Sequence, residues 1–219
     1  MTEVPSPPPE EGIVEATETV DVIVPVATGG YPVSVSADLA PEYARFMPLI
    51  KWFILIPHYF ALFFLGIGAL FVWFISFFAV LFTAKYPEGM WNYMVGVQRW
   101  ALRVVSYHLL ISDTYPPFTL DETPEDPVRL HVVYPEPVSR WRPLFAWLII
   151  LPYAIVAGLI GYVAYICSFL AFFTIIFTKK IPEGLFSVIR IGLNWQYRAN
   201  FYGYYLSTEY PPFEWDDES

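Results

Sequence analysis

Charged side chains are missing from two long stretches of this sequence. Residues 52–83 contain no Asp, Glu, Lys or Arg, and residues 147–178 lack them as well. Each stretch exceeds the roughly 20 apolar residues that one membrane-spanning helix needs. A soluble core has no place for apolar runs of this length, so the sequence predicts a mainly α-helical membrane protein.

Basic residues are missing from the N-terminal region. Residues 1–30 hold six acidic side chains and many prolines but no Lys or Arg, a composition that predicts a disordered tail. A secretory signal would begin with a basic segment and an apolar core, and neither is present. We therefore expect the N-terminus to stay in the cytoplasm and to offer residues 1–30 to a protein partner. Much of the net charge of −9 comes from this tail, so it does not indicate a nucleic-acid partner.

The patterns that mark catalytic and metal sites are also missing. The single cysteine, Cys167, excludes an internal disulfide and lies within an apolar stretch. The three histidines, His58, His108 and His131, have no recurring carboxylate or cysteine neighbours. No glycine-rich loop precedes a helix in the manner of a phosphate-binding site. We predict that the protein is not an enzyme and needs no metal or cofactor.

What the chain does contain is a tandem duplication. A shift of 95 residues places the second half on the first without a gap. Pro57 then falls on Pro152, Pro87-Glu88-Gly89 on residues 182–184, and Tyr115-Pro116-Pro117-Phe118 on residues 210–213. The sequence therefore predicts an acidic tail at residues 1–30, a first membrane repeat at 31–120 and a second at 121–219.

Each repeat begins with a short alternating segment, which predicts a half-exposed strand at residues 33–36 and 128–131. The two strands could pair with each other or with the Tyr-Pro-Pro-Phe segments. After the apolar stretch comes a helix, residues 88–111, with polar side chains at steps of three and four, and its second copy, residues 183–206, carries a looser set, Arg190, Asn194, Gln196, Arg198 and Asn200. A charged stripe beside a broad apolar face is typical of an amphipathic helix in the headgroup plane.

Two arrangements fit each apolar stretch. In one it crosses the membrane once after a short interfacial helix, and in the other it forms a helical hairpin that bends near Gly66 or Gly161. The hairpin is favoured because it leaves all twelve basic residues on one side of the membrane, as the positive-inside rule expects. Pro57 and Pro152 are expected to kink the first limb of each hairpin.

Basic side chains at the ends of the apolar stretches and on the amphipathic helices are the predicted binding residues for anionic lipid headgroups. They are Lys85, Arg99, Arg103, Lys179, Lys180, Arg190 and Arg198. The alternative is that they only hold the helices at the interface, with their aliphatic stems over apolar surface. His58 is the candidate intramembrane polar group, although its counterpart in the second repeat is Tyr153.

A family resemblance rests on the residues that close each repeat. Lys85-Tyr86-Pro87-Glu88-Gly89, Arg99-Trp100, Arg103 and Tyr115-Pro116-Pro117-Phe118 resemble domain of unknown function 4389, as does the Ile56-Pro57-His58 start. The second repeat departs from this pattern with Leu151-Pro152-Tyr153 and Asn194-Trp195. The resemblance implies a bacterial membrane protein with the domain in tandem. It brings no activity, ligand or catalytic residue.

The combined observations favour a non-enzymatic scaffold or bilayer-organising subunit in the bacterial plasma (inner) membrane, inserted as hairpins or as a multi-pass chain. The alternative is a small carrier or transport subunit framed by the two repeats, because internal repeats often frame a transport path. The oligomeric state is left open by the sequence.

Overall fold

The computed structural model describes residues 30–135 and 137–215. The chain divides into two units, residues 1–30 and 31–219, and only the second is described below. The predicted acidic tail, with the partner it would bind, lies outside the described residues except for Gly30.

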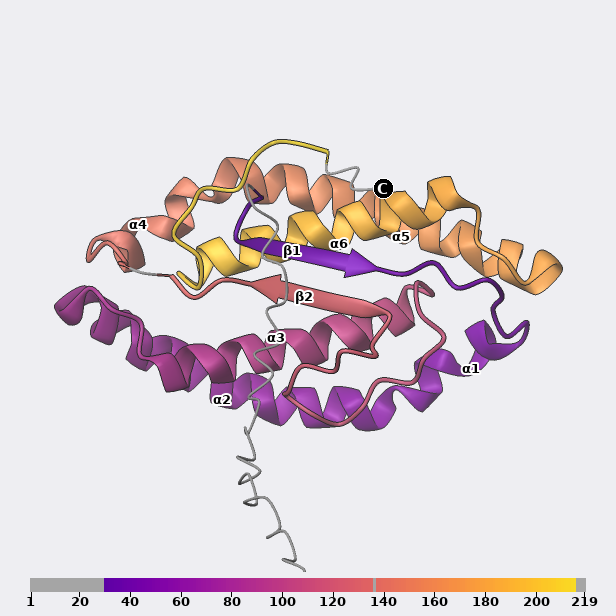
Figure 1. Cartoon of the computed structure of the whole chain (residues 1–219), viewed down its shortest axis with the longest axis horizontal. Coiled ribbons are helices and arrows are strands. Elements are labelled where there is room, and N and C mark those ends of the chain that lie inside the picture. The colour runs from indigo at the N-terminus through magenta and orange to yellow at the C-terminus, as the bar shows by residue number, and fades with distance from the viewer. Residues whose placement is uncertain (1–29, 136, 216–219) are drawn as a thin grey trace, which may run out of the picture. The chain divides into compact units, whose positions relative to one another are not determined.

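Each helix and strand of the first repeat has a counterpart 95 residues later in the second (Figure 1). The first repeat contains β1 (Val33–Ala37), α1 (Met47–Ile54), α2 (Ile56–Thr83) and α3 (Glu88–His108). The second contains β2 (Val128–Val132), α4 (Arg142–Ile149), α5 (Leu151–Thr178) and α6 (Glu183–Gly203). The described residues are mainly helical, as predicted, and both short strands lie where the alternation places them.

The predicted helical hairpins are wrong. Helices α2 and α5 are each 28 residues long and uninterrupted, and Gly66 and Gly161 lie inside them. A glycine costs a helix only about 1 kcal/mol relative to alanine. A turn in this apolar segment would instead leave several backbone groups without their helical hydrogen bonds, and its apolar side chains offer none in exchange. Continuing the helix is therefore the cheaper solution.

The prolines mark the start of the long helices instead of kinking a hairpin limb. Pro57 and Pro152 occupy the first turn of α2 and α5, where the amide hydrogen that proline lacks would have no helical partner. The short helices end just before, at Ile54 and Ile149. Each long arm is therefore a short helix followed by a long one, with a break at Leu55 or Ile150.

The two strands pair with each other, which confirms one of the two pairings considered from the sequence. They form an antiparallel two-stranded sheet in which Val35 lies opposite Leu130. These two residues are counterparts under the 95-residue shift. An axis of pseudo-two-fold symmetry therefore passes between them, perpendicular to the sheet.

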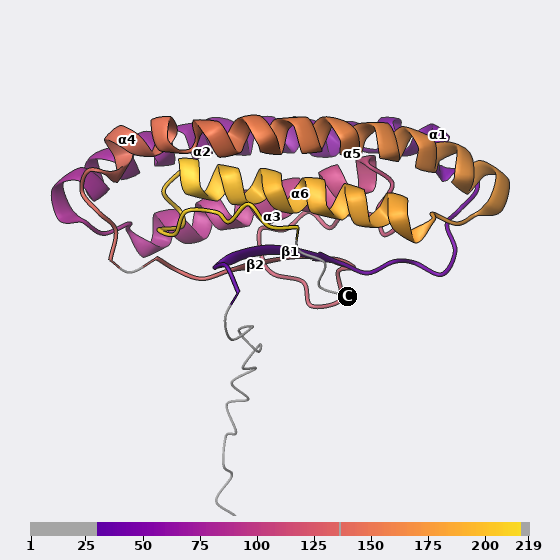
Figure 2. The ribbon, with the colours of Figure 1, turned by 90° about the horizontal axis from the view of Figure 1, so that it is seen from above.

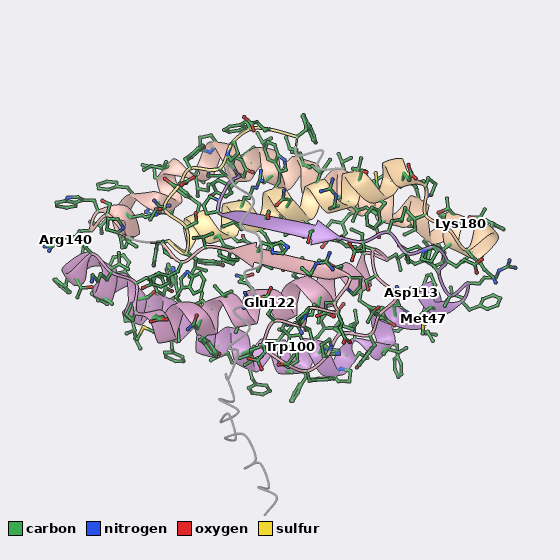
Figure 3. All side chains as sticks on the ribbon, viewed as in Figure 1. Met47, Trp100, Asp113, Glu122, Arg140 and Lys180 are labelled. Atoms are coloured by element: carbon green, nitrogen blue, oxygen red, sulfur yellow. The ribbon has the colours of Figure 1, made fainter. Side chains whose placement is uncertain are left out.

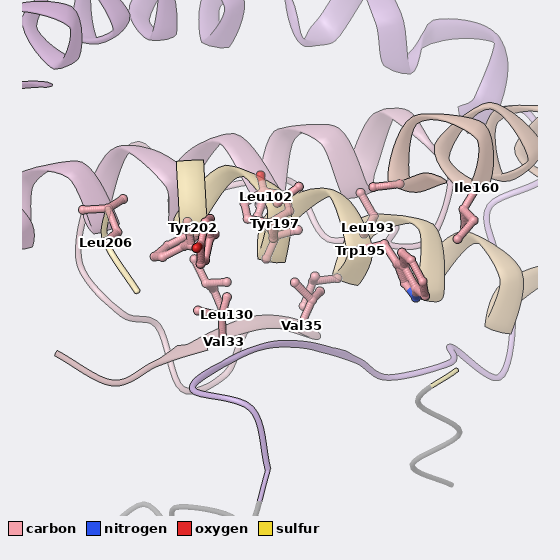
Figure 4. Packing of buried hydrophobic residues seen from close by; sticks show 14 of the residues in the cluster. Val33, Val35, Leu102, Leu130, Ile160, Leu193, Trp195, Tyr197, Tyr202 and Leu206 are labelled. Carbon is pink, nitrogen blue, oxygen red and sulfur yellow. The ribbon is translucent and has the colours of Figure 1, made fainter. Parts of the chain in front are cut away.

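The helices form two layers on one face of this sheet. Figure 2 shows α3 and α6 next to the strands, with α2 and α5 beyond them. The inward strand residues Val33, Val35 and Leu130 are buried against the middle layer (Figure 4), and Val128 is buried as well. Helices α5 and α6 approach closely at Gly192, where an added Cβ would lie 2.6 Å from the Cβ of Ala164.

The placement of α3 and α6 corrects a second expectation. They do not lie at a surface as amphipathic helices, because the long helices cover one side and the sheet covers the other. Polar side chains of these helices form hydrogen bonds inside the fold. Asn194 Oδ1 accepts a hydrogen bond of 3.1 Å from the amide of Val35, and Arg198 Nε donates to the carbonyl of Val33. Two residues of α6 thus supply hydrogen-bond partners for backbone groups of β1 on the edge that does not pair with β2.

Candidate functional site

The outer surface of α1, α2, α4 and α5 is a broad apolar face. Among the described residues, forty-two large hydrophobic side chains are exposed, seventeen of them at 46–82 and another seventeen at 141–177. On the long helices they include Phe60, Phe63, Phe64, Ile67, Phe71, Phe74, Ile155, Leu159, Tyr162, Ile166, Phe169 and Phe173. Exposed apolar patches above a few hundred Å² are rare on soluble monomers and mark a binding surface. We call this surface the apolar face.

The two basic residues within the four helices of the apolar face turn their charged groups inward. Lys51 in α1 is 1% exposed, and its Nζ lies 2.6 Å from Asp113 Oδ1 and 2.6 Å from the carbonyl oxygen of Ser112. Arg142 at the start of α4 donates to the carbonyl groups of Ser207 and Thr208. The apolar face therefore presents no ionic group along its length.

Basic residues gather instead at the two ends of the apolar face. At one end the chain before α1 meets the end of α5, where the amide of Tyr43 donates to the carbonyl of Lys179 at 2.8 Å. At the other end the amide of Val138 donates to the carbonyl of Ala84 at 3.3 Å. These contacts place exposed Arg45 beside Lys179 and Lys180, and exposed Arg140 beside Lys85. Figure 3 shows Arg140 and Lys180 at opposite ends of the fold. We call these two groups the basic ends.

The opposite side of the fold, formed by the strands and the loops beside them, carries exposed ion pairs. Arg129 pairs with Asp38 at 2.8 Å, and Arg99 pairs with Glu122 at 3.0 Å. The carboxylates of these pairs are 62% and 45% exposed. The hydrogen bonds that Arg129 donates to Asp38 raise the pKa of Arg129. Exposed apolar and exposed charged groups are thus segregated across the layers of the fold.

Two of the predicted headgroup-binding arginines do not fit that role. Arg103 is 6% exposed and lies 3.3 Å from Asp126, and burial lowers its pKa while Asp126 opposes that shift. Arg198 is 4% exposed and lies over the ring of Tyr31. Both are held between α3 or α6 and the strand layer, because their helices are covered on both sides. The predicted contact with lipid headgroups is wrong for this pair.

The other predicted residues are divided between the two surfaces. Lys85, Lys179 and Lys180 are exposed at the basic ends. Arg99 belongs to the polar side through its pair with Glu122, and Arg190 is half-buried on α6. Arg45 and Arg140 are not among the residues predicted from the sequence for headgroup contact, although they recur at a spacing of 95 residues.

His58 is fully buried within an aromatic cluster. Its ring is stacked on Phe118 at 3.9 Å between centroids, and its Nδ1 accepts a hydrogen bond of 3.0 Å from Trp100 Nε1. In the second repeat Tyr153 occupies the same place and stacks on Trp195 at 4.7 Å, with Phe213 closing the cluster. The Tyr-Pro-Pro-Phe segments therefore fold back onto the start of each long helix.

This packing gives a physical reason for the motifs that recur in the two repeats. The residue after the helix-starting proline, the tryptophan of the following helix and the terminal phenylalanine all meet in one cluster. The family profile of DUF4389, a domain of unknown function, matches residues 48–119 and 140–214. The chain belongs to the DUF4389 family. The comparisons with curated proteins and with solved structures gave no match.

The DUF4389 match confirms the tandem repeat and supplies no activity. Within the described residues, Met47–Thr83 and Leu151–Thr178 are long and apolar enough to cross a membrane, judged by length and composition. The same part of the chain holds no group of three or more His, Cys, Asp or Glu side chains arranged to bind a metal ion. The apolar face and its basic ends are accordingly the candidate functional site.

Proposed function

We propose that this DUF4389 protein is a monotopic membrane protein that lies flat in one leaflet and serves as a scaffold. The apolar face would enter the hydrocarbon, and the strand side would face the aqueous phase. The observation that carries the proposal is the segregation of exposed apolar and exposed charged side chains onto opposite sides of the fold.

The dimensions of the helix layer support the flat orientation. One layer of helices is about 10–12 Å thick, and one leaflet contributes about 15 Å of hydrocarbon. The layer of α2 and α5 therefore fits within one leaflet, while α3, α6 and the sheet remain outside it. Amphipathic helices bound in this way bury their apolar side about 5–10 Å deep.

A spanning orientation fits the charge distribution poorly. The strands run along the same direction as the long helices (Figure 1), so α2 and α5 could cross the bilayer only with the sheet beside them. The exposed pair of Arg129 and Asp38 would then lie within the hydrocarbon. A charged residue at the centre of a bilayer costs at least about 2.5–3.5 kcal/mol. In the flat orientation this pair stays in water.

The pseudo-two-fold symmetry gives independent support. The axis runs perpendicular to the sheet, so in the flat orientation it lies along the membrane normal and both repeats meet the same environment. Both basic ends would then face one headgroup layer. Each Lys or Arg near an anionic surface contributes about 1 kcal/mol of binding. We propose Lys85 and Arg140 at one end, and Arg45, Lys179 and Lys180 at the other, as the residues that contact anionic headgroups.

The hydrogen bonds of hydroxyl groups in the long helices favour a scaffold role over a transport role. Hydroxyl groups on the inner sides of the long helices are engaged within the protein, as Ser168 Oγ donates to the carbonyl of Leu109 at 2.8 Å and Ser76 Oγ donates to that of Trp73. They offer little to line a path for a solute. The scaffold would have no enzymatic activity, lie on the inner leaflet of a bacterial plasma membrane, and offer residues 1–30 to a cytoplasmic partner.

Polarised infrared spectroscopy of the protein in oriented bilayers tests the flat orientation. The amide I dichroism should show helix axes parallel to the membrane plane, because the helices run within layers that lie parallel to the membrane in the flat orientation. Dichroism that places the helix axes along the membrane normal would contradict the proposal. The role of the tail is tested separately by comparing the proteins that co-purify with the full chain and with a chain lacking residues 1–30. An unchanged set would contradict it.

A further inference from the structure

A hollow of about 410 Å³ lies where α5 ends and α6 begins, at one basic end of the apolar face. Apolar side chains of Leu39, Pro41, Ile181 and Pro182 form much of its lining, and Lys180 and Glu183 add one charge of each sign. Its volume falls within the range of small-molecule sites, roughly 300–1,000 Å³. In the flat orientation the hollow sits at headgroup depth.

The hollow reflects one difference between the two ends of the fold. Leu39 of the first repeat corresponds to Tyr134 of the second. At the other end Tyr134 reaches the turn between α2 and α3, where its hydroxyl donates to the carbonyl of Tyr86 and its ring meets Trp91 edge-on at 5.2 Å. A leucine side chain is shorter and has no hydroxyl, so Leu39 does not bridge the corresponding distance to Ile181. The space that a tyrosine takes at one end is left open at the other.

The two charged groups of the hollow are not paired with each other. Neither Lys180 nor Glu183 belongs to an ion pair among the described residues. The neighbouring Lys179 and Glu42 approach each other at 4.0 Å, so these two charges offset one another. The hollow thus presents one cation and one anion that are both open to a ligand.

We infer that this hollow binds the zwitterionic headgroup of an ethanolamine phospholipid. The lipid phosphate would accept hydrogen bonds from Lys180, and the ammonium group would donate to Glu183. The glycerol region would contact Leu39 and Pro41, and the acyl chains would follow the apolar surface of α5. A glycerol headgroup offers no cation to Glu183, and a choline headgroup has no N–H to donate. The inference rests on the proposed flat orientation in the membrane.

Native mass spectrometry of the full chain, released from nanodiscs with equal amounts of ethanolamine, choline and glycerol phospholipids, tests the inference. The wild-type protein should retain one ethanolamine lipid in preference to the other two. Leu39→Tyr, which gives this end the side chain found at the other, should lower this retention by about five- to tenfold, as should Lys180→Gln with Glu183→Gln. The matched control, Arg99→Gln with Glu122→Gln, removes one charge of each sign on the polar side and should retain the lipid as the wild-type protein does.

The surface double variant keeps the test decisive if Leu39→Tyr does not fold. Equal retention of the three lipids by the wild-type protein would overturn the inference, and so would preferred retention of the glycerol lipid. Loss of the lipid in the control variant as well would also overturn it. Total partition into vesicles of choline phospholipid, which has no net charge for the basic ends to bind, should stay unchanged in every variant. A wild-type protein that fails to partition at all would contradict the proposed function instead.

Discussion

The ammonium group of Lys51 and the guanidinium group of Arg142 occupy equivalent places in the two repeats, although the two residues are not counterparts in the sequence. Lys51 Nζ lies 4.3 Å from the ring centroid of Tyr107 and donates to the carbonyl of Ser112. Arg142 lies 4.1 Å from the ring centroid of Tyr202 and donates to the carbonyl of Ser207. Tyr202 and Ser207 lie 95 residues after Tyr107 and Ser112.

One helical turn explains how different positions reach the same place. Arg142 corresponds to Met47 and Lys51 to Ala146, so the two basic positions are four residues apart on the short helix. Residues at i and i+4 project from the same side of a helix. In each repeat, therefore, a basic side chain of the short helix binds the chain that follows α3 or α6.

Replacing Lys51 by Met should destabilise the protein. The change leaves the carboxylate of Asp113, 22% exposed, without its cation, and breaking a buried ion pair costs about 3 kcal/mol. The expected fall in Tm is about 6–12 °C, measured by thermal unfolding in a mild detergent. The double variant Met47→Arg with Lys51→Ala, which borrows the arrangement of the second repeat, should recover about half of the loss. A double variant no more stable than Lys51→Met would refute the equivalence.

The continuity of α2 can be tested at Gly66. Nothing lies within 4 Å of a Cβ added there, so Gly66→Ala should stabilise the helix by about 0.5–1 kcal/mol. Gly192→Ala is the contrasting variant, because its Cβ would meet that of Ala164 and should destabilise the fold. Chemical denaturation of both variants checks the signs. A destabilised Gly66→Ala protein would point to a turn at this position.

Single charges placed on the apolar face should weaken membrane binding. Phe71 is 63% exposed, and its counterpart Ile166 is 46% exposed. An Asp at either position would enter the hydrocarbon at a cost of about 2.5–3.5 kcal/mol, which lowers vesicle partition by about 50-fold or more. The control is Pro124→Asp in the exposed turn before β2, which should leave partition unchanged. Equal partition of all three variants would show that the apolar face does not contact lipid.

The basic ends should control binding to anionic membranes. Lys85→Gln with Arg140→Gln removes two charges worth about 1 kcal/mol each, so affinity for anionic vesicles should fall by about 30-fold at low salt. Raising the salt concentration should shrink the difference between variant and wild type. Arg99→Gln is the control, because Arg99 pairs with Glu122 on the polar side and should have no effect. A similar loss for Arg99→Gln would restore the sequence-based assignment of that residue.

Much of the repeat architecture could be predicted from the sequence, but the order of the helix and strand layers could not. The 95-residue shift, the strand alternation and the two apolar stretches each depend on local pattern, and the strands and long helices lie where those patterns place them. Burial of α3 and α6 depends on which neighbours cover them. Their apolar residues pack against both the long helices and the strands, and Arg103 and Arg198 reach the strand layer, so local amphipathicity alone pointed to a membrane surface.

The polar contacts inside the fold could not be predicted from the sequence either. Lys51 and Asp113 lie 62 residues apart, and neither recurs in the second repeat. The equivalent place in the second repeat is filled from a position one turn away, so the duplication conceals the shared interaction. The role of His58 could not be predicted for a related reason. A histidine in an apolar run and a tyrosine at the matching position do not indicate that both residues pack in equivalent aromatic clusters.

Accessibility labelling at the two ends of one arm tests the flat orientation most directly. Arg45 precedes α1, and Lys85 follows α2, so the whole arm separates them. In a Cys167→Ala background, Arg45→Cys and Lys85→Cys are each treated with a membrane-impermeant maleimide on sealed vesicles of both orientations. We predict that both cysteines react from the same side of the membrane. Reaction of the two cysteines from opposite sides would contradict the account.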